Sequence, residues 1–183
     1  MRSLKNKIVV ITGASQGIGA ALAAHFARHK CRLVLVARHN TRLREVVRDL
    51  DMQRSECLPL IVDITSSRGM REIGSRTVKK FGRIDIFINN AGVGIHKPLE
   101  ETTAKEYDAI MNTNLKAVFY SFRELIPLMR RQGGGQIINI SSGAGRIGMP
   151  GMAVYAASKA ALNIFSESVA GEVRNDNIKI SVL

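Results

Sequence analysis

Short apolar runs alternate along the chain with longer amphipathic segments, and this alternation constrains the fold more than any other feature. The runs are predicted strands at 7–12, 32–37, 58–63, 84–89, 136–141 and 178–183. Strands that alternate with helices form parallel sheets joined by right-handed crossovers. Because the runs lack regular polar alternation, helices should cover both faces of the sheet. The pattern predicts an α/β fold with a doubly wound parallel sheet, built as a single domain over residues 1–183.

Helical spacing is clear in the segments between the runs. Apolar residues at 43, 46, 47 and 50 share one helical face. Further helices are predicted at 20–29, 70–81, 107–122 and 152–173. Thr102 or Thr103 is expected to cap the long helix, with Glu106 three residues after Thr103, and Pro127 should bend that helix near its end. The run 178–183 resembles a buried central strand, so we expect the chain to be truncated after its sixth strand.

Composition excludes several classes of protein. Apolar residues make up 45% and charged residues 23%, which is a globular balance. The net charge is 27 − 15 = +12, but the basic residues are dispersed and aromatic residues are few, so nucleic-acid binding is not expected. Cys31 and Cys57 show no metal or disulfide spacing, and His25 and His29 lack a third ligand. No membrane span and no metal are expected, and a cytoplasmic location is predicted.

A glycine-rich loop follows the first predicted strand. It contains Gly13, Ser15, Gln16, Gly17, Ile18 and Gly19 and leads into a helix. Glycines at such a turn allow a pyrophosphate to approach the backbone, and the helix N-terminus offers free N–H groups to it. The loop after the first strand therefore predicts a dinucleotide site of Rossmann type, although the spacing G-x-x-x-G-x-G differs from the usual G-x-G-x-x-G.

The end of the second predicted strand indicates which dinucleotide would bind. A site for NAD usually places a carboxylate there, to bind the ribose hydroxyls. This chain has Ala37 and Arg38 instead. A guanidinium suits a 2′-phosphate, so the predicted cofactor is NADP(H). An exposed arginine that merely opens a helix is the alternative.

Tyr155 and Lys159 lie four residues apart in the last predicted helix, and so share one face. A nearby ammonium favours the phenolate form of a tyrosine, which can then exchange a proton with a substrate oxygen. Ser141 and Ser142 end the fifth predicted strand, at the sheet edge where ligands bind. Adjacent strand residues point to opposite faces, so only one of the two can serve.

Taken together, these motifs resemble those of the short-chain dehydrogenase/reductase family. The matching pieces are TGASQGIG at 12–19, Asp63-Ile64, NNAG at 89–92, NTNL at 112–115, ISS at 140–142 and YAASK at 155–159. They occur in the family's order and span the chain. Ala37-Arg38 resembles the NADP(H)-preferring branch.

The resemblance implies roles for individual residues. Tyr155 would be the catalytic acid/base, and Lys159 would assist it and hold the nicotinamide ribose. Ser142, thirteen residues before Tyr155, is favoured over Ser141 as the group that binds the substrate oxygen. Asn114 would hold a water in a proton relay, although a polar residue that merely kinks the helix is the alternative. The resemblance further places Asp63 and Ile64 at the adenine and lines the cofactor cleft with Asn90, Ala91 and Gly92.

The predicted activity is interconversion of a carbonyl and a secondary alcohol by hydride transfer. The alternative is a catalytically silent regulator or scaffold of the same fold. Phe119, Phe122, Phe165 and Val169 extend the apolar faces of two helices beyond one stripe, which predicts a homodimer or homotetramer.

Overall fold

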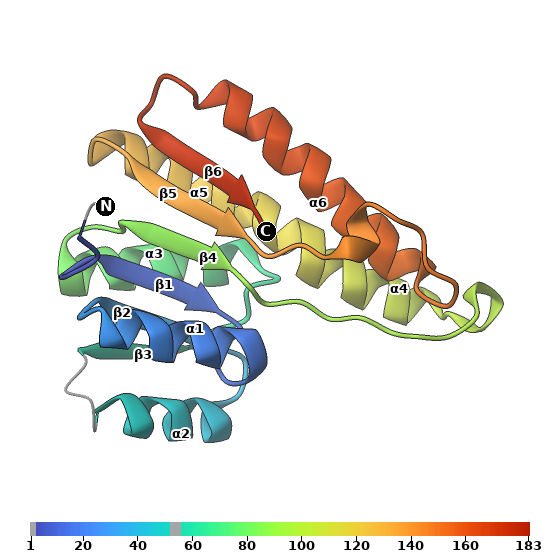
Figure 1. The fold of residues 1–183 in the computed structure, drawn as a ribbon, viewed down its shortest axis with the longest axis horizontal. Coiled ribbons are helices and arrows are strands. Elements are labelled where there is room, and N and C mark those ends of the chain that lie inside the picture. Colours follow the sequence, from blue (N-terminus) through green and yellow to red (C-terminus); the bar gives the residue numbers. More distant parts are fainter. Residues whose placement is uncertain (1–2, 52–55) are drawn as a thin grey trace.

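The computed structural model describes residues 3–51 and 56–183. Its centre is one parallel sheet of six strands in the order β3-β2-β1-β4-β5-β6. The strands are β1 (Ile8–Thr12), β2 (Arg32–Ala37), β3 (Cys57–Ile61), β4 (Ile86–Asn89), β5 (Gly135–Asn139) and β6 (Ile178–Val182). The chain winds outward from β1 to β3, then returns to the middle at β4 and winds the other way (Figure 1). This order confirms the predicted doubly wound sheet.

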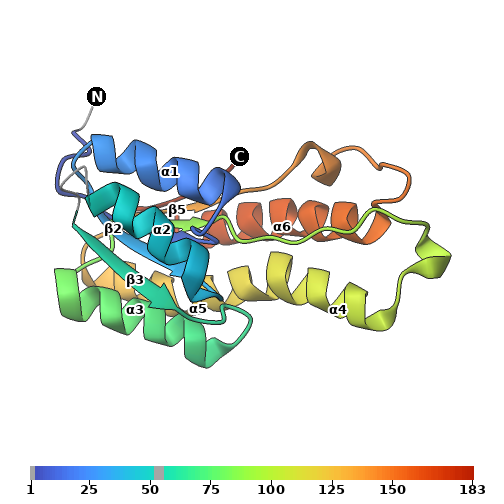
Figure 2. The same ribbon diagram turned by 90° about the horizontal axis from the view of Figure 1, so that it is seen from below.

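Helices lie on both faces of the sheet, as Figure 2 shows from below. One face carries α1 (Gly17–Arg28) and α2 (Asn40–Asp51). The other carries α3 (Ser67–Phe81), α5 (Ala117–Arg131) and α6 (Ala153–Glu172). A further helix, α4 (Ala104–Met111), precedes α5, and single turns form η1 (Leu99–Glu101) and η3 (Gly143–Gly145).

The core is divided by the sheet into two apolar clusters. Every residue of β1 is buried, and alternate side chains enter opposite clusters. Val10 packs with residues of α3, α5 and α6, whereas Val9 and Ile11 pack with residues of α1 and α2. Each fully buried aliphatic side chain contributes about 1.5–3 kcal/mol, which explains why this strand is apolar on both faces.

The predicted long helix is interrupted in the structure. Between α4 and α5 the backbone forms a π-turn, η2 (Asn112–Lys116), in which Ala117 N–H bonds to the carbonyl of Asn112. Of the two threonines that could cap the helix, Thr103 does so. Its hydroxyl accepts a bond from Glu106 N–H, while the Glu106 carboxylate accepts one from Thr103 N–H. Pro127 lies inside α5, and the helix continues to Arg131.

Three strands have a bound that differs by two residues from the prediction. The fourth begins at Ile86 rather than at residue 84, and the fifth ends at Asn139 rather than at residue 141. The third strand ends at Ile61, two residues earlier than predicted, because Asp63 accepts bonds from the backbone and side chain of Thr65 before α3. The sixth strand pairs with β5, and Ile178 at its start is buried; a central place for this strand in a longer chain stays a prediction.

Two of the four apolar side chains expected to face a partner subunit instead belong to the core. Phe122 and Val169 are buried against the sheet. Phe165 is partly buried beside Phe122, with ring centroids 5.3 Å apart. Phe119 is 40% exposed and remains available to a partner.

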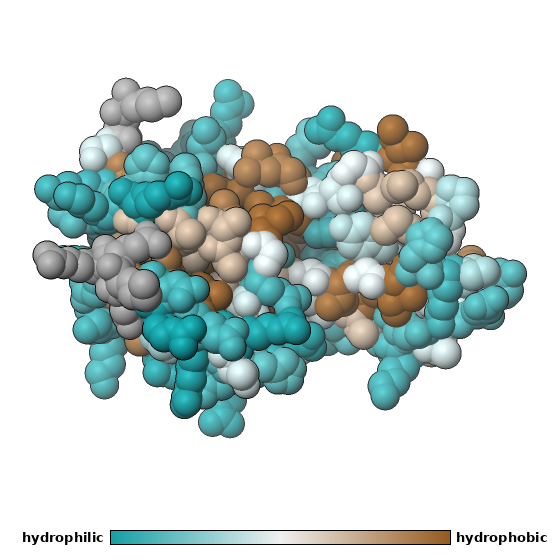
Figure 3. All heavy atoms as spheres, turned by 60° about the horizontal axis from the view of Figure 1, so that its bottom comes forward, coloured by the Kyte–Doolittle hydropathy of each residue, from teal (hydrophilic) through white to brown (hydrophobic). Residues whose placement is uncertain are grey.

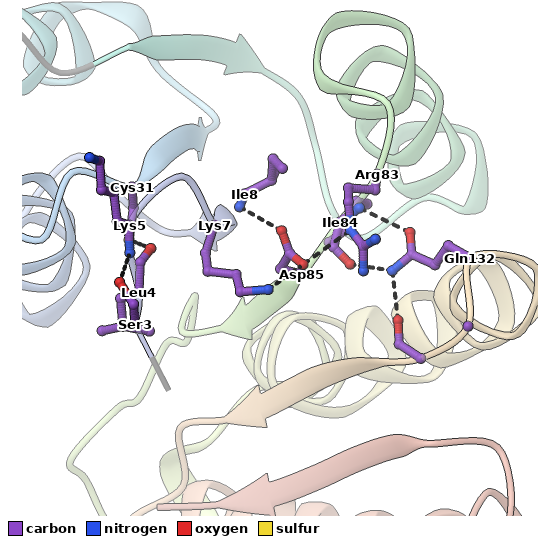
Figure 4. A network of polar contacts seen from close by, with 12 residues as sticks. Ser3, Leu4, Lys5, Lys7, Ile8, Cys31, Arg83, Ile84, Asp85 and Gln132 are labelled. Atoms are coloured by element: carbon purple, nitrogen blue, oxygen red, sulfur yellow. Dashed lines mark hydrogen bonds and ion pairs between the residues drawn. The ribbon is translucent and has the colours of Figure 1, made fainter. Parts of the chain in front are cut away.

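The amino edge of the sheet is held by a buried carboxylate, shown in Figure 4. Asp85 accepts a bond from Ile8 N–H at 2.9 Å and forms ion pairs with Lys7 at 3.3 Å and Arg83 at 3.1 Å. Because Ile8 begins β1 and Asp85 precedes β4, this carboxylate ties together the two central strands. It lies at the edge opposite the predicted site.

Most of the face seen in Figure 3 is hydrophilic, with apolar side chains gathered in separate areas. Among the described residues, no helix combines the length and apolar character that crossing a bilayer requires.

Candidate active site

The glycine loop connects the carboxyl end of β1 to α1. Gly17 adopts a positive φ of 55°, and nothing within 4 Å would meet a side chain there, so its backbone faces open space. Gly19 instead lies against the backbone of Gly13, where a Cβ atom would overlap the carbonyl. The side chain of Gln16, the N-cap of α1, makes no capping bond. The first turn of the helix therefore presents backbone N–H groups that can bind a phosphate.

A cavity of about 610 Å³ opens above this loop. It lies where the strand order reverses between β1 and β4, which is where open α/β sheets bind their ligands. The predicted residues that line it are Gly13, Ser15, Gln16, Gly17, Ile18, Arg38, Ile64, Asn90, Ala91 and Gly92. The structure thus brings together residues from the first, second, third and fourth strand ends.

Basic side chains gather at one end of this first cavity. Arg38, His39 and Arg42 all line it, and Arg42 donates a hydrogen bond to the side chain of Gln16. The part of the chain that the structure describes offers Arg38 no hydrogen-bond or ion-pair partner, and none of the described residues lining the cavity is acidic. This end is therefore suited to an anionic group.

Asp63 lies between residues that line the first cavity, and its contact with the adenine stays a prediction. Its neighbours Val62, Ile64 and Thr65 line the first cavity, but Asp63 does not. Its carboxylate is engaged with Thr65, at 2.9 Å from the amide nitrogen and 2.8 Å from the hydroxyl. Asp63 thus shapes the turn before α3.

Thr12 is the first residue of the motif at 12–19, but the sequence analysis gave it no role in the site. Its buried hydroxyl accepts bonds from the backbone N–H groups of Asn90 and Ala91, both at 3.1 Å, and donates to the carbonyl of Ile88. The Asn90 side chain returns a bond to the Thr12 carbonyl. These bonds join the ends of β1 and β4 beneath the cavity. The signal was a polar residue ending an apolar run just before the first glycine.

A second cavity, of about 380 Å³, adjoins the first and shares Ile18, Asn90, Gly92 and Val93 with it. Tyr155 and Lys159 line this second cavity together with Ile95, His96, Ile140, Ser141 and Met152. The two cavities form one cleft along the carboxyl edge of the sheet. Its far end is mainly apolar, and the polar side chains there include those of Tyr155, Lys159, His96 and Ser141.

Lys159 is almost fully buried, with 4% of its surface exposed. Its ammonium donates a hydrogen bond of 2.7 Å to the carbonyl oxygen of Ile140 and lies 5.8 Å from the centroid of the Tyr155 ring. Burial lowers the pKa of Lys159 below its usual range, because removal from water disfavours the charged form.

The two serines that follow β5, Ser141 and Ser142, make different contacts. Ser141 lines the second cavity, but its hydroxyl donates to Asn163 Oδ1 at 2.6 Å. Ser142 is the N-cap of η3, and its oxygen accepts a bond from Ala144 N–H at 3.2 Å. A hydroxyl that accepts there can still donate its proton elsewhere. Ser142 does not line either cavity in this arrangement.

Asn114 lies in the π-turn and is 1% exposed. Its side-chain oxygen accepts from Val93 N–H and its amide nitrogen donates to the Val93 carbonyl, both at 2.9 Å. The same nitrogen donates to the hydroxyl of Ser158. Asn114 therefore clamps the segment after β4 to α6, next to Lys159.

A family model for short chain dehydrogenases matches residues 7–183. The chain belongs to the short-chain dehydrogenase family. Members of this family are oxidoreductases that use a nicotinamide dinucleotide, and the cleft described above has the place and shape that such a cofactor requires.

Curated relatives of this short-chain dehydrogenase agree with the family. The chain is 32% identical to an uncharacterized oxidoreductase from Staphylococcus saprophyticus, covering 99% of the chain and 78% of the relative. It is also 32% identical to a 3-oxoacyl-(acyl-carrier-protein) reductase from Thermotoga maritima, covering 98% of the chain and 73% of the relative.

Solved structures show the same fold. A short-chain dehydrogenase/reductase from Burkholderia phymatum, in complex with NAD, matches with a TM-score of 0.96 and 29% identity, covering 100% of this chain and 66% of that one. A metagenomic short-chain oxidoreductase in complex with NADP matches with a TM-score of 0.93 and 37% identity, covering 98% and 82%. These two relatives carry different dinucleotides.

Proposed function

We propose that this short-chain dehydrogenase interconverts a carbonyl and a secondary alcohol with NADP(H), with Tyr155 as the acid/base. The observation that carries the proposal is the single cleft at the carboxyl edge of the sheet. One end has the glycine loop and Arg38, and the other has Tyr155 and Lys159 against apolar walls. We infer that residues 1–183 contain both the dinucleotide-binding and the catalytic parts of the domain.

Several features support NADP(H) over NAD(H). The free guanidinium of Arg38 would bind the 2′-phosphate, with Arg42 and His39 adding donors at the same end. Ala37, which precedes Arg38, leaves room beside it. The pyrophosphate, which both dinucleotides contain, would bind at the first turn of α1, where the backbone of Gly17 is open.

The chain's own residues would carry the proton chemistry. When bound, NADPH supplies the hydride that reduces the carbonyl carbon. The Tyr155 hydroxyl donates its proton to the carbonyl oxygen, and Ser142 donates a hydrogen bond to the same oxygen as it gains negative charge. Lys159 stabilises the resulting phenolate. Asn114 holds the Val93 segment that forms one wall of the cleft and lies beside Lys159.

The test is reduction of a panel of small ketones and aldehydes by NADPH, with the full chain and with Tyr155→Phe. The phenol acts only when the oxygen must be protonated, so Tyr155→Phe should lower kcat by about 10²–10⁴-fold and leave the Kd for NADPH nearly unchanged. Tyr107→Phe is the matched control, because Tyr107 is 48% exposed on α4.

Equal turnover by the protein and by Tyr155→Phe would refute the proposed role of Tyr155. Tight NADPH binding with no turnover of any carbonyl would favour the silent regulator instead.

A further inference from the structure

Helix α6 carries a third polar side chain in line with Tyr155 and Lys159. Asn163 follows Lys159 at the same four-residue interval, so it lies on the same face one turn further along. It lines neither cavity. Any effect of Asn163 on a reaction at Tyr155 must therefore pass through other residues.

The amide of Asn163 bonds to two points of the segment between β5 and α6. Ser141 Oγ donates to Asn163 Oδ1 at 2.6 Å, and Asn163 Nδ2 donates to the carbonyl of Gly145 at 3.2 Å. One of these points comes directly before Ser142 and the other three residues after it. A single side chain thus restrains the short stretch that contains Ser142 from both sides.

Hydrogen bonds inside this stretch make it a compact unit. Ser142 Oγ accepts from Ala144 N–H at 3.2 Å, and the Ser142 carbonyl accepts from Gly145 N–H at 2.9 Å. Because Gly145 is bonded both to Ser142 and to Asn163, a shift of the Asn163 amide would move the turn and the Ser142 hydroxyl with it.

The stretch also lies directly against α6. A Cβ atom at Gly145 would lie 2.9 Å from Asn163 Nδ2 and 3.0 Å from Lys159 Cβ, which leaves no space for a side chain. One turn away, the Lys159 ammonium bonds to the Ile140 carbonyl just before Ser141. The contacts of Lys159 and Asn163 together set the distance between the serine segment and the helix that carries Tyr155.

We propose that Asn163 is a positioning residue, which holds the Ser142 hydroxyl in register with Tyr155 through Ser141 and Gly145. This inference rests on the proposed function, in which Ser142 binds the substrate oxygen. In the absence of Asn163 the chemical step should slow, while the dinucleotide end of the cleft should not change.

The kinetic test compares Asn163→Leu with Asn175→Leu in the full chain. Asn175 is exposed in the turn before β6 and controls for the same chemical change. Loss of two neutral hydrogen bonds should lower kcat by about tenfold, with the Kd for NADPH within about twofold of the parent value. Ser141→Ala removes one of the two bonds and should lower kcat by a smaller factor.

A double mutant distinguishes positioning from a general structural effect. In a Ser142→Ala background, Asn163→Leu should cause no further loss of kcat, because the group it positions is already absent. The same tenfold loss in both backgrounds would overturn the proposal. Tyr155→Phe in the same assay tests the proposed function separately: if Tyr155→Phe is inactive and Asn163→Leu is fully active, only the positioning role fails.

A second measurement needs neither substrate nor cofactor. Amide hydrogen exchange of residues 144–147 reports the bonds of the Ser142 turn, because their N–H groups bond to Ser142 or Gly143. Asn163→Leu should accelerate their exchange by about tenfold, and Asn175→Leu should not. Unchanged exchange at 144–147 in Asn163→Leu would show that the amide does not hold this segment, whatever the kinetics.

Discussion

The ammonium of Lys159 donates a hydrogen bond of 2.7 Å to the carbonyl oxygen of Ile140, although the residue is 4% exposed. A buried ammonium with one backbone acceptor has lost much of its hydration, which lowers its pKa from the ordinary value of 10.5. A buried charged side chain such as Lys159 lowers the stability of the fold, and its presence in a cleft is typical of a functional site.

Lys159→Met should therefore separate stability from activity. Methionine fills a similar volume without burying a charge, so the free energy of unfolding should be unchanged or higher at neutral pH. Turnover should fall by at least about 10²-fold, and NADPH should bind more weakly. Urea unfolding and steady-state kinetics measure the two effects.

The lowered pKa of Lys159 also predicts how the difference in stability between the parent protein and Lys159→Met changes with pH. Because the folded pKa is lowered, the unfolded protein binds more protons in the interval between the folded pKa and 10.5. Stability of the parent protein should rise with pH across that interval, so any stability advantage of Lys159→Met should shrink as the pH becomes alkaline. An advantage that grows with pH would contradict the proposed cost of burial.

Arg38 should determine the choice between the two dinucleotides. Under the proposed function, Arg38→Gln would remove a charge-assisted contact to the 2′-phosphate, which is worth about 1.5–3 kcal/mol. The Kd for NADPH should rise by about 10- to 150-fold, and the Kd for NADH should hardly change. Fluorescence titration with both cofactors measures this. Arg44→Gln is the control, since Arg44 bonds to Asn40 and does not line the cavity.

If the parent protein binds NADPH and NADH equally tightly, the assignment of Arg38 is wrong. A loss of affinity for both cofactors in Arg38→Gln would point to a distorted site.

Glu106 should titrate at unusually low pH. The hydrogen bond from Lys97, followed by those from Thr103, lowers the pKa of Glu106 from 4.5 to about 2. The capping of α4 by this carboxylate should therefore persist above pH 4.5 and be lost as the pH falls toward about 2. Carboxyl ¹³C NMR of Glu106 measures its pKa directly.

Lys97→Met should raise the pKa of Glu106, whereas Lys116→Met, on the π-turn, should not. The Lys97 ammonium lies 2.7 Å from the Glu106 carboxylate, and the Lys97 backbone N–H bonds to the carbonyl of Gly151. Protonation of Glu106 should therefore also weaken the packing of the segment around Lys97, which lies beside the second cavity. A Glu106 pKa that is the same with and without Lys97 would contradict this account.

The exposed apolar side chains of α5 and α6 should mediate self-association. Phe119 is 40% exposed and Ile164 65% exposed, and an unpartnered apolar helix face usually buries itself against another surface. We expect a homodimer or homotetramer, and Phe119→Glu with Ile164→Glu should produce monomers. Sedimentation equilibrium measures the state, and Leu99→Glu on η1 is the control at a site with similar exposure, 62%. A monomeric parent protein would refute this prediction.

Local patterns in the sequence were enough to predict the architecture of the sheet. Continuous apolar runs predict strands covered on both faces, and all six appear in one parallel sheet in doubly wound order. Thr103 and Glu106 form the predicted cap, because a capping box depends only on residues three apart. The four-residue spacing of Tyr155 and Lys159 likewise places both at the second cavity, because one helical turn sets their geometry.

Contacts between distant segments could not be predicted in this way. Asn114, which lies in the break of the long helix, bonds to Val93 and Ser158, and these partners are 21 and 44 residues away in sequence. The Asn163 contact with Ser141 joins residues 22 apart in sequence.

The sequence by itself determined the elements, their order and the chemical groups available at the strand ends. Only the tertiary structure decided which of those groups share a cavity, and which are already engaged by a neighbour. The physical reason is that backbone propensity and hydrophobic periodicity act within a few residues, whereas the partner of a side-chain hydrogen bond depends on how separate elements pack against each other.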